Sequence, residues 1–205
     1  MTTEAPPAGA KPAGLPRVDV VLVHYPVRAR TGEVVTTAVT NLDIHDIARA
    51  SRTFGVRTFQ IVTPLTAQRE LVESVISHWR DGPEGLRVPE RVEALHLVRV
   101  QAQLDDAIHA IQAEEKQAPL VVITSANPRG RPTATFAEFR RQLAGETRPI
   151  TLCFGTGWGL ADSVFEHADV VLEPIMKGVP YNHLSVRVAV GIVLDRLLGD
   201  RPDSQ

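Results

Sequence analysis

From Val18 onward, short runs of β-branched residues alternate with longer stretches of helical periodicity, and this alternation limits the folds open to the chain. Strands are expected at residues 18–23, 56–62, 95–100, 120–124, 150–154 and 170–172, and helices at 42–54, 66–80, 102–115, 135–144 and from near Leu184. Alternating strands and helices favour a parallel sheet that helices cover on both faces. The sequence therefore predicts an α/β fold with a mainly parallel, six-stranded sheet.

The length of the chain suits one such domain. Its 205 residues, 43% of them hydrophobic, can form one well-packed core but hardly two. Residues 1–17 hold four prolines among Ala, Gly and Thr, a composition that buries too little apolar surface to offset its ordering entropy. We expect a flexible tail at 1–17, a single domain at 18–199 and a short tail at 200–205.

Charge and cysteine content limit which partners the protein can bind and indicate the cellular compartment in which it works. The net charge is −2 and the pI about 6.4, so any nucleic-acid contact must come from local patches. Of the 22 basic residues 19 are arginines, which suits phosphate contacts but also fits a compositional bias of the source genome. The single Cys153 is typical of a core residue, the histidines lack metal-ligand spacing, and no apolar run reaches the ~18–20 residues of a membrane span. We expect a cytoplasmic protein without a metal or a membrane anchor.

A glycine-rich turn follows the strand expected at 150–154. Gly155, Gly157 and Gly159 lack a Cβ, so a ligand can approach the main chain there, and Trp158 favours a lid or a packing role. Open α/β sheets bind ligands at the carboxyl ends of their strands, where this turn should lie. The spacing matches neither a phosphate-binding loop nor a dinucleotide motif, and a tight turn into a helix at Leu160 is an alternative.

Two other loops suit a nucleotide-like ligand. Residues 124–128, Thr-Ser-Ala-Asn-Pro, end a strand with small and polar residues and precede Arg129 and Arg131, although Asn and Pro also have ordinary roles in turns. Residues 181–185, Tyr-Asn-His-Leu-Ser, lead into the last helix, where the asparagine or the serine could simply cap it. An adenosine-sized ligand could lie between the first of these loops, residues 124–128, and the glycine turn.

A long connection and the helix after it hold further polar residues. Residues 24–41 are long for a βα loop, and loops beyond ~12 residues are usually functional or disordered. Near the helix start, Asp43 could serve only the helix dipole, whereas Arg49 is the best candidate for gripping a phosphate. Residues 81–90, rich in Gly and Pro, are expected to form a plain surface loop. No residue spacing supports covalent catalysis.

Three separated segments resemble the motifs of the SPOUT superfamily of RNA methyltransferases. They are NLDIHDIARASRTFGV at 41–56, ITLCFGTGWGL at 150–160 and YNHLSV at 181–186, and they occur in the right order. The resemblance covers about residues 18–198. Within the superfamily, the chain looks like a small single-domain bacterial group related to the tRNA guanine-N1 methyltransferase fold.

The resemblance implies a cofactor, a topology and a partner. The cofactor would be S-adenosylmethionine, held in a deep trefoil knot formed by the C-terminal segment. The protein would be a homodimer in which Arg49 lies near the cofactor of the partner subunit. Mapped by motif, the cofactor-binding residues are Thr124, Ser125, Ala126, Phe154, Gly155, Thr156, Gly157, Trp158, Gly159, Glu173, Pro174, Ile175, Tyr181, Asn182, His183, Leu184 and Ser185.

The resemblance also implies an RNA substrate, tRNA or rRNA. Asp43 and His183 depart from the asparagines typical of the ribose-methylating branch, so a base nitrogen and a ribose 2′-oxygen both stay open as targets. Either residue could accept the proton, whereas Arg49 is a poor base and would hold phosphate. The expected RNA contacts are Arg28, Arg30, Asn41, Arg129 and Arg131.

Two functions from different classes follow. The first is an S-adenosylmethionine-dependent RNA methyltransferase with Arg49, Asp43 and His183 as catalytic residues. The second is a non-catalytic RNA-binding or nucleotide-responsive module that keeps the fold, which the acidic balance and the two departures favour. A hydrolase using His45 and Asp43 has the least support, because nothing supplies a nucleophile.

Overall fold

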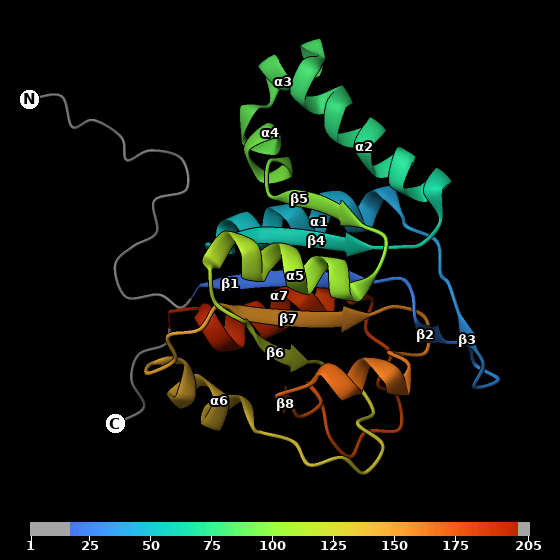
Figure 1. The fold of residues 1–205 in the computed structure, drawn as a ribbon, viewed down its shortest axis with the longest axis vertical. Coiled ribbons are helices and arrows are strands. Elements are labelled where there is room, and N and C mark those ends of the chain that lie inside the picture. The colour runs from blue at the N-terminus through green and yellow to red at the C-terminus, as the bar shows by residue number, and fades with distance from the viewer. Residues whose placement is uncertain (1–16, 201–205) are drawn as a thin grey trace, which may run out of the picture.

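The computed structural model describes residues 17–200, so nearly all of the two expected tails lies outside the described residues. Within this range, six parallel strands form one sheet in the order β5-β4-β1-β7-β6-β8 (Figure 1). The strands are β1 (Val18–Val23), β4 (Thr58–Val62), β5 (Val98–Gln101), β6 (Leu120–Ile123), β7 (Ile150–Gly155) and β8 (Val170–Val171). The α/β class and the six-stranded parallel sheet are confirmed.

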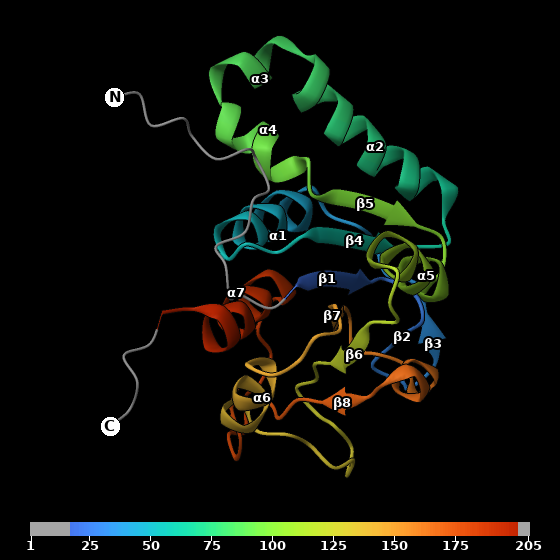
Figure 2. The ribbon, with the colours of Figure 1, turned by 60° about the vertical axis from the view of Figure 1, so that its left-hand side comes forward.

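Helices cover both faces of this sheet. Figures 1 and 2 show α1 and α7 on one face and α5 on the other, while α2, α3 and α4 extend past the edge strand β5. The helices are α1 (Asn41–Thr53), α2 (Thr66–Asp81), α3 (Pro83–Arg87), α4 (Pro89–Leu95), α5 (Leu104–Glu115), α6 (Phe136–Leu143) and α7 (Val186–Leu198). A 3-10 helix, η1 (Asp162–His167), and a hairpin of β2 (Val27–Arg28) and β3 (Val34–Val35) complete the described elements.

The side chains of β1 divide between two hydrophobic clusters. Val20 and Leu22 belong to the cluster that includes residues of α1 and α7, whereas Val21 and Val23 belong to the cluster that includes residues of α5 and η1. Successive strand residues point to opposite faces, so a strand between two helical layers has to be mostly apolar. This is why the strands read as continuous apolar runs in the sequence.

The plain surface loop predicted at residues 81–90 was wrong, because two short helices lie there. Pro83 and Pro89 stand in the first turns of α3 and α4. Proline is tolerated there because N–H groups in the first turn make no hydrogen bond within the helix. The strand predicted from residue 95 correspondingly begins only at Val98. The helix considered at Leu160 is also absent: that residue bridges to Val27, and η1 begins two residues later.

Three loops leave the carboxyl edge of the sheet side by side. From β1 the strand order runs outward through β4 to β5 and then resumes beyond β1 with β6 and β7, so the order reverses next to β1. Such a reversal opens a crevice where α/β sheets bind ligands. The loops there are 124–127 after β6, 155–159 around the end of β7 and 172–185 after β8. Threading of the C-terminal segment through a knot stays a prediction.

Candidate cofactor-binding site

The glycine turn after β7 is held against β2 by main-chain hydrogen bonds. The Arg28 N–H donates to the Gly159 carbonyl at 2.8 Å, and the Trp158 N–H donates to the Arg28 carbonyl at 3.0 Å. Gly157 has a φ of +58°, and a Cβ on it would lie 3.1 Å from the Arg28 carbonyl oxygen. Position 157 therefore needs glycine for its conformation and for its close approach to β2.

A polar chain ties the same turn to the end of β1. The Thr156 hydroxyl lies 3.2 Å from the Val23 carbonyl oxygen and makes a short hydrogen bond with the Thr37 hydroxyl, which lies 3.0 Å from Nδ1 of His24. The His24 ring is fully buried, and its Nε2 has no hydrogen-bond partner among the described residues. Burial lowers the pKa of His24 from 6.5 to about 4. A neutral histidine thus supports the turn, a role that the sequence analysis missed.

The three loops predicted to bind the cofactor contact one another. The Asn182 side-chain amide donates to the carbonyls of Ala126 and Met176, each at 3.2 Å. The rings of Trp158 and His183 lie 5.5 Å apart, so the third loop also contacts the glycine turn. The structure therefore brings the segments after β6, β7 and β8 to one place.

Exposed aromatic rings and open glycines leave room for a ligand beside these contacts. Trp158 is 56% exposed and Tyr181 is 75% exposed. Gly159 and Gly178 have φ values of +96° and +69°, and nothing lies within 4 Å of where a Cβ would stand. Aromatic faces and accessible main-chain groups suit an adenine-containing ligand, so these loops fit S-adenosylmethionine.

Several side chains in the predicted cofactor set have structural contacts instead. Phe154 is buried in the core. A Glu173 carboxylate oxygen accepts from the Phe136 N–H at 2.9 Å, and the Ile175 carbonyl accepts from the Arg196 guanidinium at 3.0 Å. Phe154 is thus a core residue, while the Glu173 side chain and the Ile175 main chain tie the loop to α6 and α7.

The remaining polar members of the predicted set make local contacts. The Thr124 hydroxyl donates to the Cys153 carbonyl at 2.9 Å, and the Ser125 hydroxyl accepts from the Asn127 N–H at 3.1 Å. Ser185 is the N-cap residue of α7, without a side-chain hydrogen bond to the helix. The other members of the third loop are Pro174, which is half-buried, and Leu184, which is exposed.

Three of the predicted RNA contacts form one arginine cluster around Asp162. The Asp162 carboxylate pairs with Arg28 and Arg131 at 2.7 Å each and with Arg129 at 3.4 Å. The guanidinium groups of Arg131 and Arg129 lie over the Phe165 ring, 4.1 and 5.6 Å from its centre. The cluster joins β2, the loop after β6 and η1, and holds three positive charges against one negative charge. Sequence reasoning missed Asp162, which is 134 residues from Arg28.

The other two predicted RNA contacts lie outside the arginine cluster. Arg30 is exposed between β2 and β3, and Asn41 is the exposed first residue of α1. Within residues 17–200, no hydrogen bond or ion pair joins either side chain to the cluster. The structure therefore groups three of the five predicted contacts and leaves two apart.

The predicted catalytic residues do not contact one another in a single chain. Asp43 is buried, and its two carboxylate oxygens are engaged by Arg187 at 3.2 Å and by the Thr40 hydroxyl at 2.6 Å. Arg49 is exposed on α1, and His183 is exposed on the third loop. Among the described residues, no hydrogen bond, ion pair or ring contact joins any two of Asp43, Arg49 and His183.

The sequence of this domain matches a known family almost from end to end. Residues 17–199 match the model of a family described as SAM-dependent RNA methyltransferase. The chain belongs to this family. The RNA methyltransferase resemblance inferred from the three motifs and S-adenosylmethionine as the family's cofactor are thereby confirmed.

Three relatives match nearly all of this chain but differ in how much of their own length is matched. Proteins named tRNA (guanine-N(1)-)-methyltransferase from Oleidesulfovibrio alaskensis and Nitratidesulfovibrio vulgaris are 45% and 46% identical over 179 residues, which is 87% of this chain. The chain spans only 41% of the length of each of these relatives. An Aquifex aeolicus protein whose name gives no activity is 36% identical over 88% of this chain and 87% of its own length. The domain therefore occurs both alone and as part of longer proteins.

Solved structures share the fold at low identity. A methylase family protein from Neisseria gonorrhoeae matches with a TM-score of 0.63 and 19% identity, over 96% of this chain and 87% of that chain. A TrmH/SpoU tRNA modifying enzyme from A. aeolicus matches with a TM-score of 0.53 and 15% identity, over 88% of this chain and 73% of that chain. At these identities the likeness concerns the fold alone.

The remaining sequence predictions concern the metal, the membrane and the single thiol. In the part of the chain that the structure describes, no group of three or more His, Cys, Asp or Glu side chains could hold a metal ion. No helix between residues 17 and 200 is long and apolar enough to cross a membrane. Cys153 lies fully buried in β7, where burial raises its pKa to about 12. This thiol is a core group and not a nucleophile.

Proposed function

We propose that this methyltransferase domain transfers a methyl group from S-adenosylmethionine to tRNA. The observation that supports the proposal most strongly is the convergence of three ligand-accessible loops at the carboxyl edge of the sheet. Two relatives named for tRNA methylation suggest the substrate class. Because the chain spans 41% of each, their guanine-N1 reaction can belong to the rest of those proteins. The proposal therefore names tRNA, with a base nitrogen and a ribose oxygen as the two possible outcomes of the product analysis.

The cofactor would be held mainly by main-chain groups of residues 124–127, 155–159 and 176–183. Gly159 and Gly178 leave the backbone open, and Trp158 and Tyr181 offer aromatic faces. When bound, S-adenosylmethionine supplies an electrophilic methyl group on a sulfonium. The tasks left to the protein are to position the RNA and to accept a proton from the methylated atom.

His183 is the proposed proton acceptor. Its ring is exposed and lies 5.5 Å from the Trp158 ring in the glycine turn. Asp43, the other residue considered for this role, is buried and has both carboxylate oxygens engaged by Arg187 and Thr40, so neither oxygen is free to contact a substrate. The arginine cluster of Arg28, Arg129 and Arg131 would hold RNA phosphates near this proton acceptor.

A homodimer completes the proposed active site. The Arg49 side chain is exposed and makes no hydrogen bond or ion pair within residues 17–200, so it is available to a second subunit. Leu42 on α1 and Val188 on α7 are 59% and 47% exposed, as expected of apolar residues that a second copy covers. We place this dimer in the cytoplasm, with Arg49 acting on RNA bound to the partner subunit.

Calorimetric titration of S-adenosylhomocysteine tests the cofactor site. Gly157→Arg should abolish binding, because the new side chain starts 3.1 Å from the Arg28 carbonyl within the glycine turn. Gly145→Arg is the matched control, since nothing lies within 4 Å of its Cβ position. No binding by the folded wild-type dimer would favour the non-catalytic module instead.

Transfer of a labelled methyl group to tRNA tests the catalytic roles. Arg49→Ala should lose transfer and keep S-adenosylhomocysteine binding, whereas Arg141→Ala, at an exposed arginine on α6, should keep both. Mixing the Arg49→Ala and His183→Ala proteins should restore part of the activity, because hybrid dimers contain one site with both residues. Unchanged turnover of Arg49→Ala would remove this residue from the mechanism. Nucleoside analysis of the product identifies the methylated atom.

A further inference from the structure

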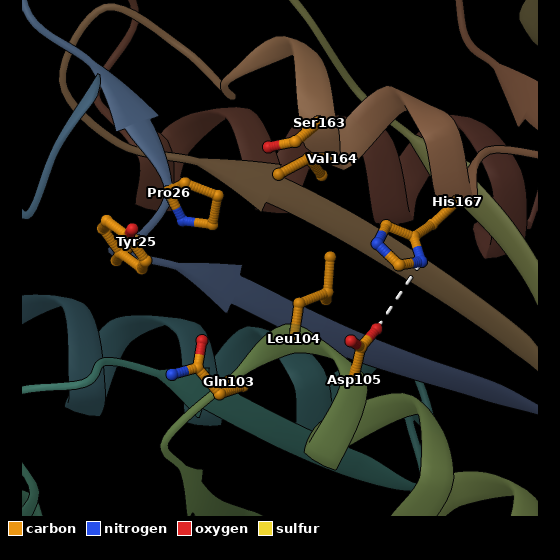
Figure 3. Close-up of a pocket in the computed structure, with 8 residues that line it drawn as sticks. All are labelled: Tyr25, Pro26, Gln103, Leu104, Asp105, Ser163, Val164 and His167. Atoms are coloured by element: carbon orange, nitrogen blue, oxygen red, sulfur yellow. Dashed lines mark ion pairs between the residues drawn. The ribbon is translucent and has the colours of Figure 1, made fainter. Parts of the chain in front are cut away.

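A pocket of about 150 Å³ lies beside the glycine turn, outside the proposed cofactor site. Figure 3 shows Tyr25 and Pro26 on one side of it, Gln103 and Asp105 at the start of α5, and Ser163 and His167 on η1. The volume is well below the roughly 300–1,000 Å³ of pockets for drug-sized ligands. It suits one flat ring system better than a whole cofactor.

The strand β2 separates this pocket from the glycine turn. The Pro26 carbonyl accepts from the Ala161 N–H at 3.2 Å, and Arg28 exchanges hydrogen bonds with Gly159 and Trp158 two residues further on. Pro26, directly before β2, lines the pocket, while Arg28 at the end of β2 holds the glycine turn. A ligand in the pocket would thus sit one strand away from the proposed site of methyl transfer.

The arginine cluster is linked to the pocket through neighbouring residues in the chain. Ser163, which lines the pocket, directly follows Asp162, the carboxylate that pairs with Arg28 and Arg131. Arg28 in turn lies two residues after Pro26. With three guanidinium groups against one carboxylate, the cluster keeps a positive charge that attracts phosphate.

The lining of the pocket combines an aromatic ring with polar edge groups. Tyr25 can stack on a base, and Gln103 and Ser163 can both donate and accept hydrogen bonds. Across the pocket, His167 pairs with Asp105 at 3.6 Å, which adds a further donor and acceptor (Figure 3). Stacking with edge hydrogen bonds is how proteins recognise unpaired RNA bases.

We propose that this pocket binds an unpaired nucleobase of the RNA substrate, near the methylated nucleotide, while the arginine cluster holds the adjoining phosphate. The inference rests on the proposed function for its choice of RNA. In this proposal Tyr25 stacks on the base. The pocket recognises the base just before β2, and the arginine cluster binds the phosphate from Arg28 onward.

A titration with mononucleotides tests the pocket without requiring methyl transfer. Uridine and guanosine 5′-monophosphate are added at millimolar concentration to the 15N-labelled protein with S-adenosylhomocysteine present, so that the cofactor loops are offered their own ligand. We expect amide shifts at Tyr25, Gln103 and Ser163, which inorganic phosphate alone does not produce. Shifts confined to the arginine cluster with either ligand, or no shifts, would overturn the base pocket.

The second test measures how tightly variants of the pocket bind a fluorescein-labelled single-stranded RNA and tRNA. Ser163→Trp fills the pocket, Ser163→Ala is its matched control, and Tyr25→Phe keeps the stacking ring that Tyr25→Ala removes. Ser163→Trp and Tyr25→Ala should each weaken RNA binding at least about fivefold without changing its salt dependence. Arg131→Ala should reduce the salt dependence instead.

The outcomes for the pocket and for the proposed function are separable. RNA affinity of Ser163→Trp equal to that of the wild type would overturn the pocket and leave the methyltransferase in place. Failure of the wild type to bind S-adenosylhomocysteine or to methylate tRNA would refute the proposed function, while the mononucleotide titration would still support or overturn the pocket.

Discussion

Lowering the pH should weaken the fold through His24, whose ring is buried at the end of β1. Burial lowers the pKa of His24 from 6.5 to about 4, and the charge of Asp43 opposes this only in part. As the pH falls, the unfolded chain therefore takes up the proton before the folded chain does. The contribution to stability is complete above pH ~6.5 and is lost progressively as the pH falls toward 4.

The size of the effect follows from the distance between the two pKa values. A shift from 6.5 to about 4 corresponds to roughly 3 kcal/mol of unfolding free energy once the pH is below both values. At pH 5 the unfolded histidine is almost fully protonated and the folded one is mostly neutral. The loss between pH 8 and pH 5 should therefore be about 2 kcal/mol.

Urea unfolding at pH 8 and pH 5 measures this loss. His24→Asn places an amide near Nδ1, which lies 3.0 Å from the Thr37 hydroxyl, and removes the titration. The wild type should lose about 2 kcal/mol more than this variant over the interval, and His109→Asn, at an exposed histidine on α5, should behave like the wild type. Equal losses in the wild type and His24→Asn would refute the idea that a buried neutral histidine supports the glycine turn.

Four further predictions concern the core and the loops. Cys153, whose pKa burial raises to about 12, should react with a thiol reagent only as fast as the protein unfolds, and rapid labelling under native conditions would contradict its burial. Gly155→Ala places a Cβ 2.7 Å from a Leu160 side-chain carbon and should lower the unfolding free energy by ~1–3 kcal/mol. Gly159→Ala, with open space around it but a φ of +96°, should cost about 1–2 kcal/mol from backbone strain alone, and denaturant unfolding compares the two. Asn182→Ala removes the hydrogen bond to the Ala126 carbonyl and should weaken S-adenosylhomocysteine binding several-fold by calorimetry, since a net hydrogen bond contributes roughly 0.5–1.5 kcal/mol; unchanged affinity would mean that the third loop needs no such tie.

Most of the sheet could be predicted because the signal for a buried strand is local. β1 and β7 are mostly apolar, with one polar side chain each at Asp19 and Thr151, and both begin at the residues expected from the sequence. The two helices α3 and α4 were missed because Gly and Pro usually mark loops, although proline is also favourable in the first turn of a helix. Local patterns cannot distinguish these two uses of proline.

The candidate site divides in the same way. The glycine turn and the two other loops were recognisable because each is a short continuous segment with an unusual composition. The partners of these segments were not recognisable: Asp162 joins arginines on two separate loops, and the Thr37 hydroxyl meets that of Thr156 across 119 residues. His24 gave no signal at all, because one histidine after a strand has no pattern of its own.

By itself, the sequence determined the fold class, the family and the three loops that form the candidate site, since periodicity and motifs are properties of neighbouring residues. Only the tertiary structure decided which charged side chains pair with an opposite charge and which keep an excess charge that can bind a ligand. Asp43 is neutralised by Arg187, 144 residues away, whereas the arginine cluster keeps more positive than negative charge beside the Tyr25 pocket. Such pairings depend on how the parallel strands bring distant loops to one edge of the sheet, and no local pattern in the chain encodes them.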